Sequence, residues 1–145
     1  MNRVKWLVLG LGFGGIVPAY GCLYFMSISD SPAYWGQALT WYAALIITFV
    51  GAISWGHALS HSSISDAKRC FLLIWGIAPA VLSWFCLFLP YPLIVGPLIG
   101  LYLLALALDS VIHQSVVIAR YWIPMRAALT VGMVFALALS AYLAL

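Results

Sequence analysis

The sequence predicts an all-α integral membrane protein, a single domain over residues 1–145 that forms a bundle of five transmembrane helices. The first observation is composition: 66% of the residues are hydrophobic and only 6% are charged, whereas about a quarter of the residues in a soluble domain are charged. The second is a series of five apolar segments, each near the roughly 20 residues that a membrane-spanning helix needs. The third is that all six lysine and arginine residues lie in or beside three short polar gaps between these segments.

The five expected spans cover residues 5–26, 36–58, 70–89, 92–113 and 124–145. The first follows a short basic region, as the apolar part of a cleaved signal peptide would. Its apolar run continues through Met26, and we therefore expect it to remain as a membrane helix. Few residues are left for a water-soluble domain.

The basic residues predict the orientation of the bundle. They are Arg3, Lys5, Lys68, Arg69, Arg120 and Arg126, and their gaps all lie on one side of the membrane if every segment spans it. Lysine and arginine in short loops are retained on the cytoplasmic side, so we expect a cytoplasmic N-terminus and a C-terminus outside. The basic residues occur singly or in pairs and form no polybasic cluster, so we expect no nucleic-acid partner.

A glycine-rich stretch in the first segment has two interpretations. Residues 10–15, Gly-Leu-Gly-Phe-Gly-Gly, have the GxGxxG spacing of a dinucleotide-binding turn. That fingerprint requires a preceding strand in a soluble domain, whereas here nine residues precede it and a membrane segment follows. We therefore interpret Gly10 and Gly14 as a face for close helix packing.

The last segment carries a small residue at every fourth position: Ala128, Gly132, Ala136, Ser140 and Ala144. Residues four apart share one face of a helix, and small residues let another helix approach closely in lipid. We favour a neighbour from the same chain. Contact with other membrane-protein subunits, through this face or through the Gly10 and Gly14 face, is the expected route to a partner.

Tryptophan–glycine pairs recur at Trp35, Trp55 and Trp75, at about the length of one span. Tryptophan is enriched where helices leave the hydrocarbon core. We interpret the three residues as parts of aromatic belts near the span ends.

Ionisable side chains at membrane depth are candidates for function, because they are costly in lipid. We expect Asp109, His57 and Arg126 to lie at similar depth near the cytoplasmic ends of their helices. His113 follows Asp109 by one turn, and His61 follows His57 by one turn if that helix continues. In one interpretation this cluster binds a metal, a haem or a quinone headgroup, or relays protons. In the other, which we favour, Asp109 pairs with Arg126, His57 and His113 cap helices or form hydrogen bonds at the interface, and the cluster fixes the positions of the helices.

Several stretches occur in the order of a known family. They are the glycine-rich opening of residues 9–18, residues 42–56 ending in Trp55-Gly56, Pro79 with Trp84, the lone Asp109, and Tyr121-Trp122-Ile-Pro-Met-Arg126. The chain resembles the uncharacterised membrane family of mitochondrial transmembrane protein 69 and short proteobacterial proteins, a domain of unknown function. The resemblance implies a small multi-pass protein of the bacterial inner membrane, or of the mitochondrial inner membrane in a eukaryote, and it implies no activity.

The matched landmarks include Trp55, Gly56, Asp109, Trp122 and Arg126. Family members often have a histidine just before the tryptophan–glycine pair, where this chain has Ser54, and this departure weakens a ligand role for His57. The candidate cofactor-binding residues are therefore His57, Asp109, His113, Arg126 and Trp55, with no cofactor identified.

No catalytic residue or metal ligand is assigned. A metal site needs several ligands with fixed surroundings, and no serine, histidine and acid set has a recognisable catalytic spacing, so we do not expect an enzyme. Two hypotheses about function follow. The first is an accessory or assembly subunit of a larger inner-membrane complex, with a respiratory complex as the candidate. The alternative is binding or transport of a lipophilic molecule, such as a quinone, a haem or a lipid, at the polar cluster in the cytoplasmic leaflet.

Overall fold

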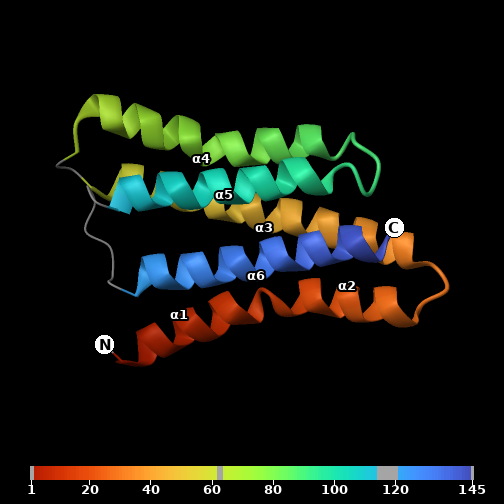
Figure 1. The fold of residues 1–145 in the computed structure, drawn as a ribbon. Coiled ribbons are helices and arrows are strands. Elements are labelled where there is room, and N and C mark those ends of the chain that lie inside the picture. The colour runs from red at the N-terminus through yellow and green to blue at the C-terminus, as the bar shows by residue number, and fades with distance from the viewer. Residues whose placement is uncertain (1, 62–63, 114–120, 145) are drawn as a thin grey trace.

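The computed structural model describes residues 2–61, 64–113 and 121–144. Within these ranges the chain forms six helices and no strand: α1 Asn2–Gly14, α2 Val17–Ile28, α3 Pro32–Ser60, α4 Asp66–Cys86, α5 Val95–His113 and α6 Trp122–Leu143. The helices run along one long axis, and the two termini lie at opposite ends of the bundle (Figure 1). The starts of α1, α4 and α6 lie at the same end, together with the ends of α3 and α5 (Figure 1).

Five helical segments of the described chain are long and apolar enough to cross a membrane: Arg3–Ile28, Pro32–Ser60, Asp66–Cys86, Val95–Ile112 and Trp122–Leu143. This confirms the prediction of an all-helical chain with five apolar spans. The largest shift is in the third span, which begins at Asp66 and ends at Cys86 instead of covering residues 70–89. Ser65 explains the earlier start, because its side chain accepts a hydrogen bond from the Lys68 backbone N–H and caps the helix.

The first apolar segment is broken into α1 and α2 between Gly14 and Val17. Pro18 lies in the first turn of α2, and proline has no N–H to donate to the carbonyl four residues earlier. The Gly15 carbonyl accepts a hydrogen bond from the Tyr42 hydroxyl of α3. As a result, α2 packs against both α3 and α6, whereas α1 packs mainly against α6.

Helix α3 is the centre of the bundle and contacts α2, α4, α5 and α6. Its closest approach is to α4, where a Cβ atom on Gly51 would lie 2.9 Å from the Gly76 carbonyl oxygen.

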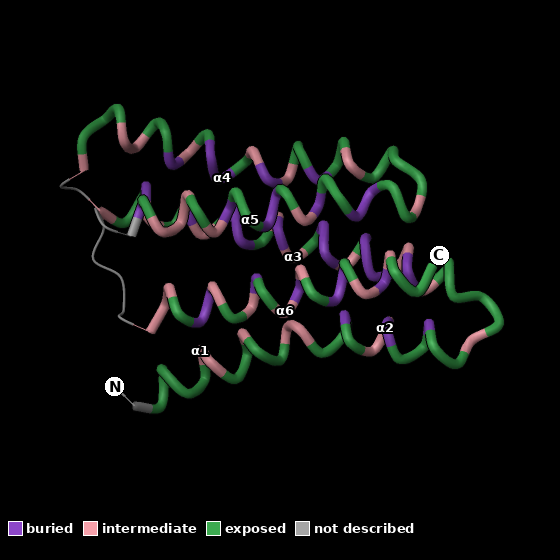
Figure 2. The backbone as a smooth tube through the Cα atoms, in the orientation of Figure 1, coloured by how far each residue is buried: buried purple, intermediate pink, exposed green. Residues whose placement is uncertain are grey.

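Buried residues face the middle of the bundle, and exposed ones face outward (Figure 2). Large apolar side chains more than half exposed include Leu11, Leu45, Phe49, Ile74, Val131 and Phe135. Such an extensive apolar exterior indicates contact with lipid.

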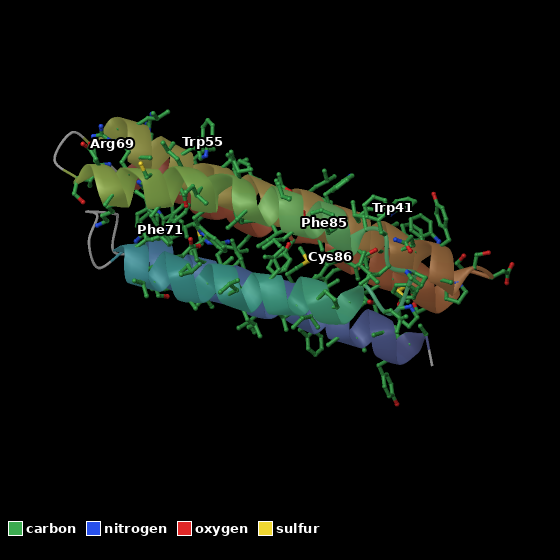
Figure 3. All side chains as sticks on the ribbon, turned by 90° about the horizontal axis from the view of Figure 1, so that it is seen from above. Trp41, Trp55, Arg69, Phe71, Phe85 and Cys86 are labelled. Atoms are coloured by element: carbon green, nitrogen blue, oxygen red, sulfur yellow. The ribbon has the colours of Figure 1, made fainter. Side chains whose placement is uncertain are left out.

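The interpretation of Trp75 as part of an aromatic belt is wrong. Trp75 lies in the middle of α4 and is only 7% exposed. Trp55 packs over the neighbouring Gly76, and its indole Nε1 donates to the Leu73 carbonyl at 2.8 Å. Trp55 and Arg69 lie toward one end of the bundle, with Trp41 toward the other (Figure 3). Tryptophan–glycine pairs therefore also serve helix packing, since glycine leaves room for the indole.

The small-residue face of α6 is covered within the chain along its middle. Ala136 and Ser140 are fully buried, and a Cβ atom on Gly132 would clash with Ile16. The Tyr20 hydroxyl of α2 donates to the Gly132 carbonyl at 3.2 Å. Only the ends of this face, Ala128 and Ala144, are exposed.

The loop between α4 and α5 reaches the far end of the same face, because the Tyr91 hydroxyl donates to the Ser140 carbonyl. Burial raises the pKa of Tyr91, so the phenol stays protonated and able to donate. The Gly10 and Gly14 face differs, because nothing lies within 4 Å of a Cβ atom built on either residue. Contact with another subunit at either face remains a prediction.

Candidate functional site

An ion pair joins the end of α5 to the start of α6. Arg126 Nε donates to Asp109 Oδ2 at 3.0 Å, and Arg126 Nη2 lies 3.0 Å from the same oxygen. The two helices run antiparallel side by side (Figure 1), which brings these residues to the same level. The Arg126 and Asp109 side chains are only 5% and 14% exposed. The predicted pairing of Asp109 with Arg126 is confirmed.

Two buried polar atoms at this site form no hydrogen bond within the described part of the chain. Arg126 Nη2 is close to the carboxylate but lacks hydrogen-bond geometry, and Thr130 Oγ1 is buried one turn further along α6. Buried polar groups almost always have a partner, and leaving one without a partner is costly. These two atoms lie one turn apart on the same face of α6.

Arg126 and Thr130 line a cavity of about 430 Å³ whose remaining walls are almost entirely apolar. This volume falls in the range of small-molecule sites. The walls come from α1 (Val8, Leu11 and Gly12), from α3 (Ile46, Phe49, Val50 and Ile53), from α5 (Tyr102), from α6 (Trp122, Met125, Leu129 and Met133), and from Gly15 and Ile16 at the helix break.

The cavity opens sideways between α1 and α3. Leu11 and Phe49 line it from these two helices, yet they are 70% and 68% exposed. The break after Gly14 separates the helices here, because α1 packs mainly against α6. Ile46 and Met133, near the middles of α3 and α6, line the cavity as well. The cavity therefore extends from the ion pair toward the middle of the bundle and opens where lipid would surround it.

A second, very small cavity lies beside Asp109. It is lined by Ile53, Ser54, His57, Asp109, Ile112 and Trp122, and its volume of about 10 Å³ suits a single water molecule. Ile53 and Trp122 line both cavities. The ion pair and these two side chains therefore separate the water-sized cavity from the large apolar one.

His57 and Asp109 are thus brought together, as the sequence predicts. His61 follows at the end of α3, where its Nδ1 lies 3.2 Å from the His57 carbonyl oxygen. The His61 carbonyl accepts from Arg69 Nη2 at 3.2 Å, which ties the end of α3 to α4. The His61 side chain thus contacts the backbone at the end of α3, whereas hydrogen bonding by the His57 and His113 side chains stays a prediction.

One candidate, Trp55, is not part of this arrangement. Trp55 packs against α4 through Gly76 and Leu73 and lines neither cavity. His113 is the last residue of α5, and its side chain lies outside the described residues. Across residues 2–61, 64–113 and 121–144, no group of three histidine, cysteine or acidic side chains could hold a metal ion.

Thr130, Tyr102 and the large cavity itself are not among the residues and sites expected from the sequence. Thr130 follows Arg126 by four residues, and this spacing puts both on one helix face. Tyr102 is 2% exposed and donates to the Ala43 carbonyl at 2.8 Å, a long-range contact that no local pattern indicates. Pro18 beside the glycine cluster is the one signal that could have indicated a broken first helix.

The apolar exterior, the five spans and the buried ion pair define a multi-pass membrane protein. Residues 4–142 match the family described as a protein of unknown function, DUF3429, and the chain belongs to this family. Neither the curated proteins nor the solved structures contain a match to the chain. The description of the family gives no activity, so the residues of the ion pair and the two cavities are the basis for a proposed function.

Proposed function

We propose that this protein binds a lipophilic small molecule in the large cavity between α1, α3 and α6. The observation that carries the proposal is a pair of buried polar atoms that form no hydrogen bond within the described residues, Arg126 Nη2 and Thr130 Oγ1, in an otherwise apolar cavity. A few polar groups in an apolar cavity are typical of small-molecule sites, where they orient the ligand. The ligand would have a polar end at Arg126 and an apolar body that reaches toward Met133.

The lateral opening supports access from the membrane. A lipophilic molecule dissolved in the bilayer reaches Leu11 and Phe49 without crossing water, because both side chains are exposed on the outer surface. We propose binding alone, because transport would need a second opening of the cavity toward the other side of the membrane. His57 lines the water-sized cavity together with Asp109, on the side of the ion pair away from the large cavity.

Analysis of bound molecules tests this proposal. The full chain is purified from its native membrane in mild detergent, and its small molecules are extracted and identified by mass spectrometry. Leu129→Trp fills the cavity, and the matched control Leu45→Trp adds the same indole to an outward side chain that is 69% exposed. We expect a retained lipophilic molecule in the wild type and in Leu45→Trp, and its loss from Leu129→Trp. The same molecules in all three samples, or none in the wild type, would contradict the proposal.

A second candidate function is an accessory or assembly subunit of a larger inner-membrane complex. The uncovered Gly10 and Gly14 face of α1 supports it, because small residues promote helix contacts in lipid. The resemblance to the family of mitochondrial transmembrane protein 69 makes a respiratory complex the candidate. Stoichiometric partner proteins that copurify with the wild type and with Val17→Leu, but not with Gly10→Leu, would support this role. A chain that purifies alone from native membranes would contradict it.

We further propose that the chain lies in a bacterial inner membrane, or a mitochondrial one in a eukaryote, with its N-terminus in the cytoplasm or matrix. The support is the clustering of charge: Arg3, Lys5, Lys68, Arg69 and Arg126 belong to the starts of α1, α4 and α6, which share one end of the bundle. In this orientation the ion pair lies near the inner surface, and the cavity extends outward from it.

A further inference from the structure

The ion pair limits the charge of a ligand that the large cavity can accept. Among the described residues that line the cavity, Arg126 carries the one formal charge. That charge is compensated by Asp109, whose Oδ2 lies 3.0 Å from both Nε and Nη2. The polar end of the cavity is therefore close to electrically neutral before any ligand binds.

An anionic ligand would disturb this balance. It would lose its hydration in apolar surroundings, and it would be repelled by the Asp109 carboxylate that already occupies one side of the guanidinium. A neutral acceptor faces neither cost, because it brings only lone pairs to an N–H and an O–H that form no hydrogen bond within the described residues. The buried donors at Arg126 and Thr130 thus favour a hydrogen-bond acceptor without formal charge.

The arrangement of donors also indicates the kind of acceptor. Arg126 offers N–H groups alone, and Thr130 offers an O–H. They are four residues apart on one helix face, so a carbonyl oxygen with two lone pairs can accept from both. The Tyr102 hydroxyl is not available as a donor, because it already donates to the Ala43 carbonyl.

We infer that the large cavity holds a neutral lipophilic carbonyl compound, whose carbonyl oxygen accepts hydrogen bonds from Arg126 Nη2 and Thr130 Oγ1. This inference rests on the proposed binding function and specifies its ligand class. The same carbonyl chemistry occurs in an ester-bearing lipid and in a long-chain quinone, and the test separates these two sources. Asp109 acts in this site as a positioning residue, since it holds the guanidinium and neutralises it.

The first test compares three probes on the full chain in non-ionic detergent at mildly alkaline pH. The probes are palmitate, its methyl ester and a decyl-substituted benzoquinone, and native mass spectrometry measures the fraction bound. We expect the ester or the quinone to bind at least about tenfold more tightly than palmitate. Preference for the ester identifies an ester lipid as the source, and preference for the quinone identifies a quinone. If palmitate binds as tightly as its ester, the inference falls while the binding function stands, and if no probe binds, both fall.

The second test removes the hydroxyl of Thr130 without changing the size of the side chain. Thr130→Val is expected to weaken binding of the preferred carbonyl probe about tenfold and to leave the melting temperature of the ligand-free protein unchanged or higher, because an unpartnered buried hydroxyl is lost. The matched control is Thr40→Val, whose buried hydroxyl donates to the Gln37 carbonyl at 2.7 Å outside the cavity. This control should lower the melting temperature and leave probe affinity unchanged. Equal probe affinity in Thr130→Val and the wild type would overturn the inference.

Discussion

Arg126 Nε donates a hydrogen bond to Asp109 Oδ2 at 3.0 Å, and Arg126 Nη2 lies 3.0 Å from the same oxygen, in a pair whose side chains are 5% and 14% exposed. This contact connects the start of α6 to the end of α5. It also separates the large apolar cavity from the water-sized cavity at His57. Its contribution to stability can be measured independently of any ligand.

Removal of one member of the pair should be strongly destabilising. Asp109→Asn leaves a buried guanidinium without its counter-charge, and Arg126→Gln leaves a buried carboxylate. We expect each single change to lower the free energy of unfolding by about 3 kcal/mol. Denaturant unfolding in detergent micelles measures the change.

The double variant Asp109→Asn with Arg126→Gln provides the control. It removes both charges, so its loss should be smaller than the sum of the two single losses, with a coupling of about 1–3 kcal/mol. Additive losses would show that the two side chains act independently and that the observed contact contributes little.

Gly76→Ala should be destabilising, because a Cβ atom there collides with the Trp55 indole, its Nε1 lying only 2.7 Å away. The indole would have to move, and its 2.8 Å hydrogen bond to the Leu73 carbonyl would be lost. We expect a cost of about 1–3 kcal/mol, typical of an overpacked contact. Gly56→Ala is the matched control, since nothing lies within 4 Å of a Cβ atom there. Similar melting temperatures for the two variants would mean that the α3–α4 contact tolerates a methyl group.

Much of this fold could be predicted, because the thickness of a bilayer sets the length of each apolar helix. A span needs about 20 apolar residues, so the positions of the five spans follow from hydropathy. The break at Gly15 could not be located, because it depends on Pro18 and on the Tyr42 hydroxyl from a different helix. The burial of Trp75 could not be predicted for a similar reason, because it depends on how other helices pack against α4.

The candidate site was only partly predictable. Asp109 and Arg126 could be paired from sequence, because both lie near the same end of consecutive antiparallel helices. The large cavity could not be predicted, because its shape depends on how α1 diverges from α3 beyond the helix break. Thr130 had no signal of its own, since an isolated threonine in an apolar helix usually bonds within that helix.

Tyr42→Phe should loosen α1. The Tyr42 hydroxyl donates to the Gly15 carbonyl at the helix break, and removing it leaves that carbonyl without this partner. We expect a loss of about 1 kcal/mol in stability. Hydrogen exchange should become faster in residues 2–14 and stay unchanged in α4. Tyr142→Phe, at a site that is 72% exposed, is the control. Unchanged exchange in α1 would mean that the hydroxyl does not hold the break.

A reporter that is active only in the cytoplasm, fused after Leu145, should be silent. The termini lie at opposite ends of the bundle (Figure 1), and the basic residues cluster at the end where α1, α4 and α6 begin. Basic residues in short loops stay inside, so the C-terminus should be outside. The same reporter fused before Met1 is the positive control. A strong signal from the C-terminal fusion would show that the C-terminus is cytoplasmic, so that either the orientation or the number of spans differs from the prediction.

Leucine at Gly132 or Ala136 should be destabilising, because these residues allow α6 to approach α2 and the centre of the bundle. Ala136 is fully buried, and Gly132 faces Ile16, so a larger side chain must push helices apart. We expect losses of about 1–3 kcal/mol or more. Val131→Leu is the control, since Val131 is 66% exposed on another face of α6. Thermal unfolding in detergent measures all three changes. Equal melting temperatures for the Gly132, Ala136 and Val131 variants would show that the close approach of α6 contributes nothing to stability.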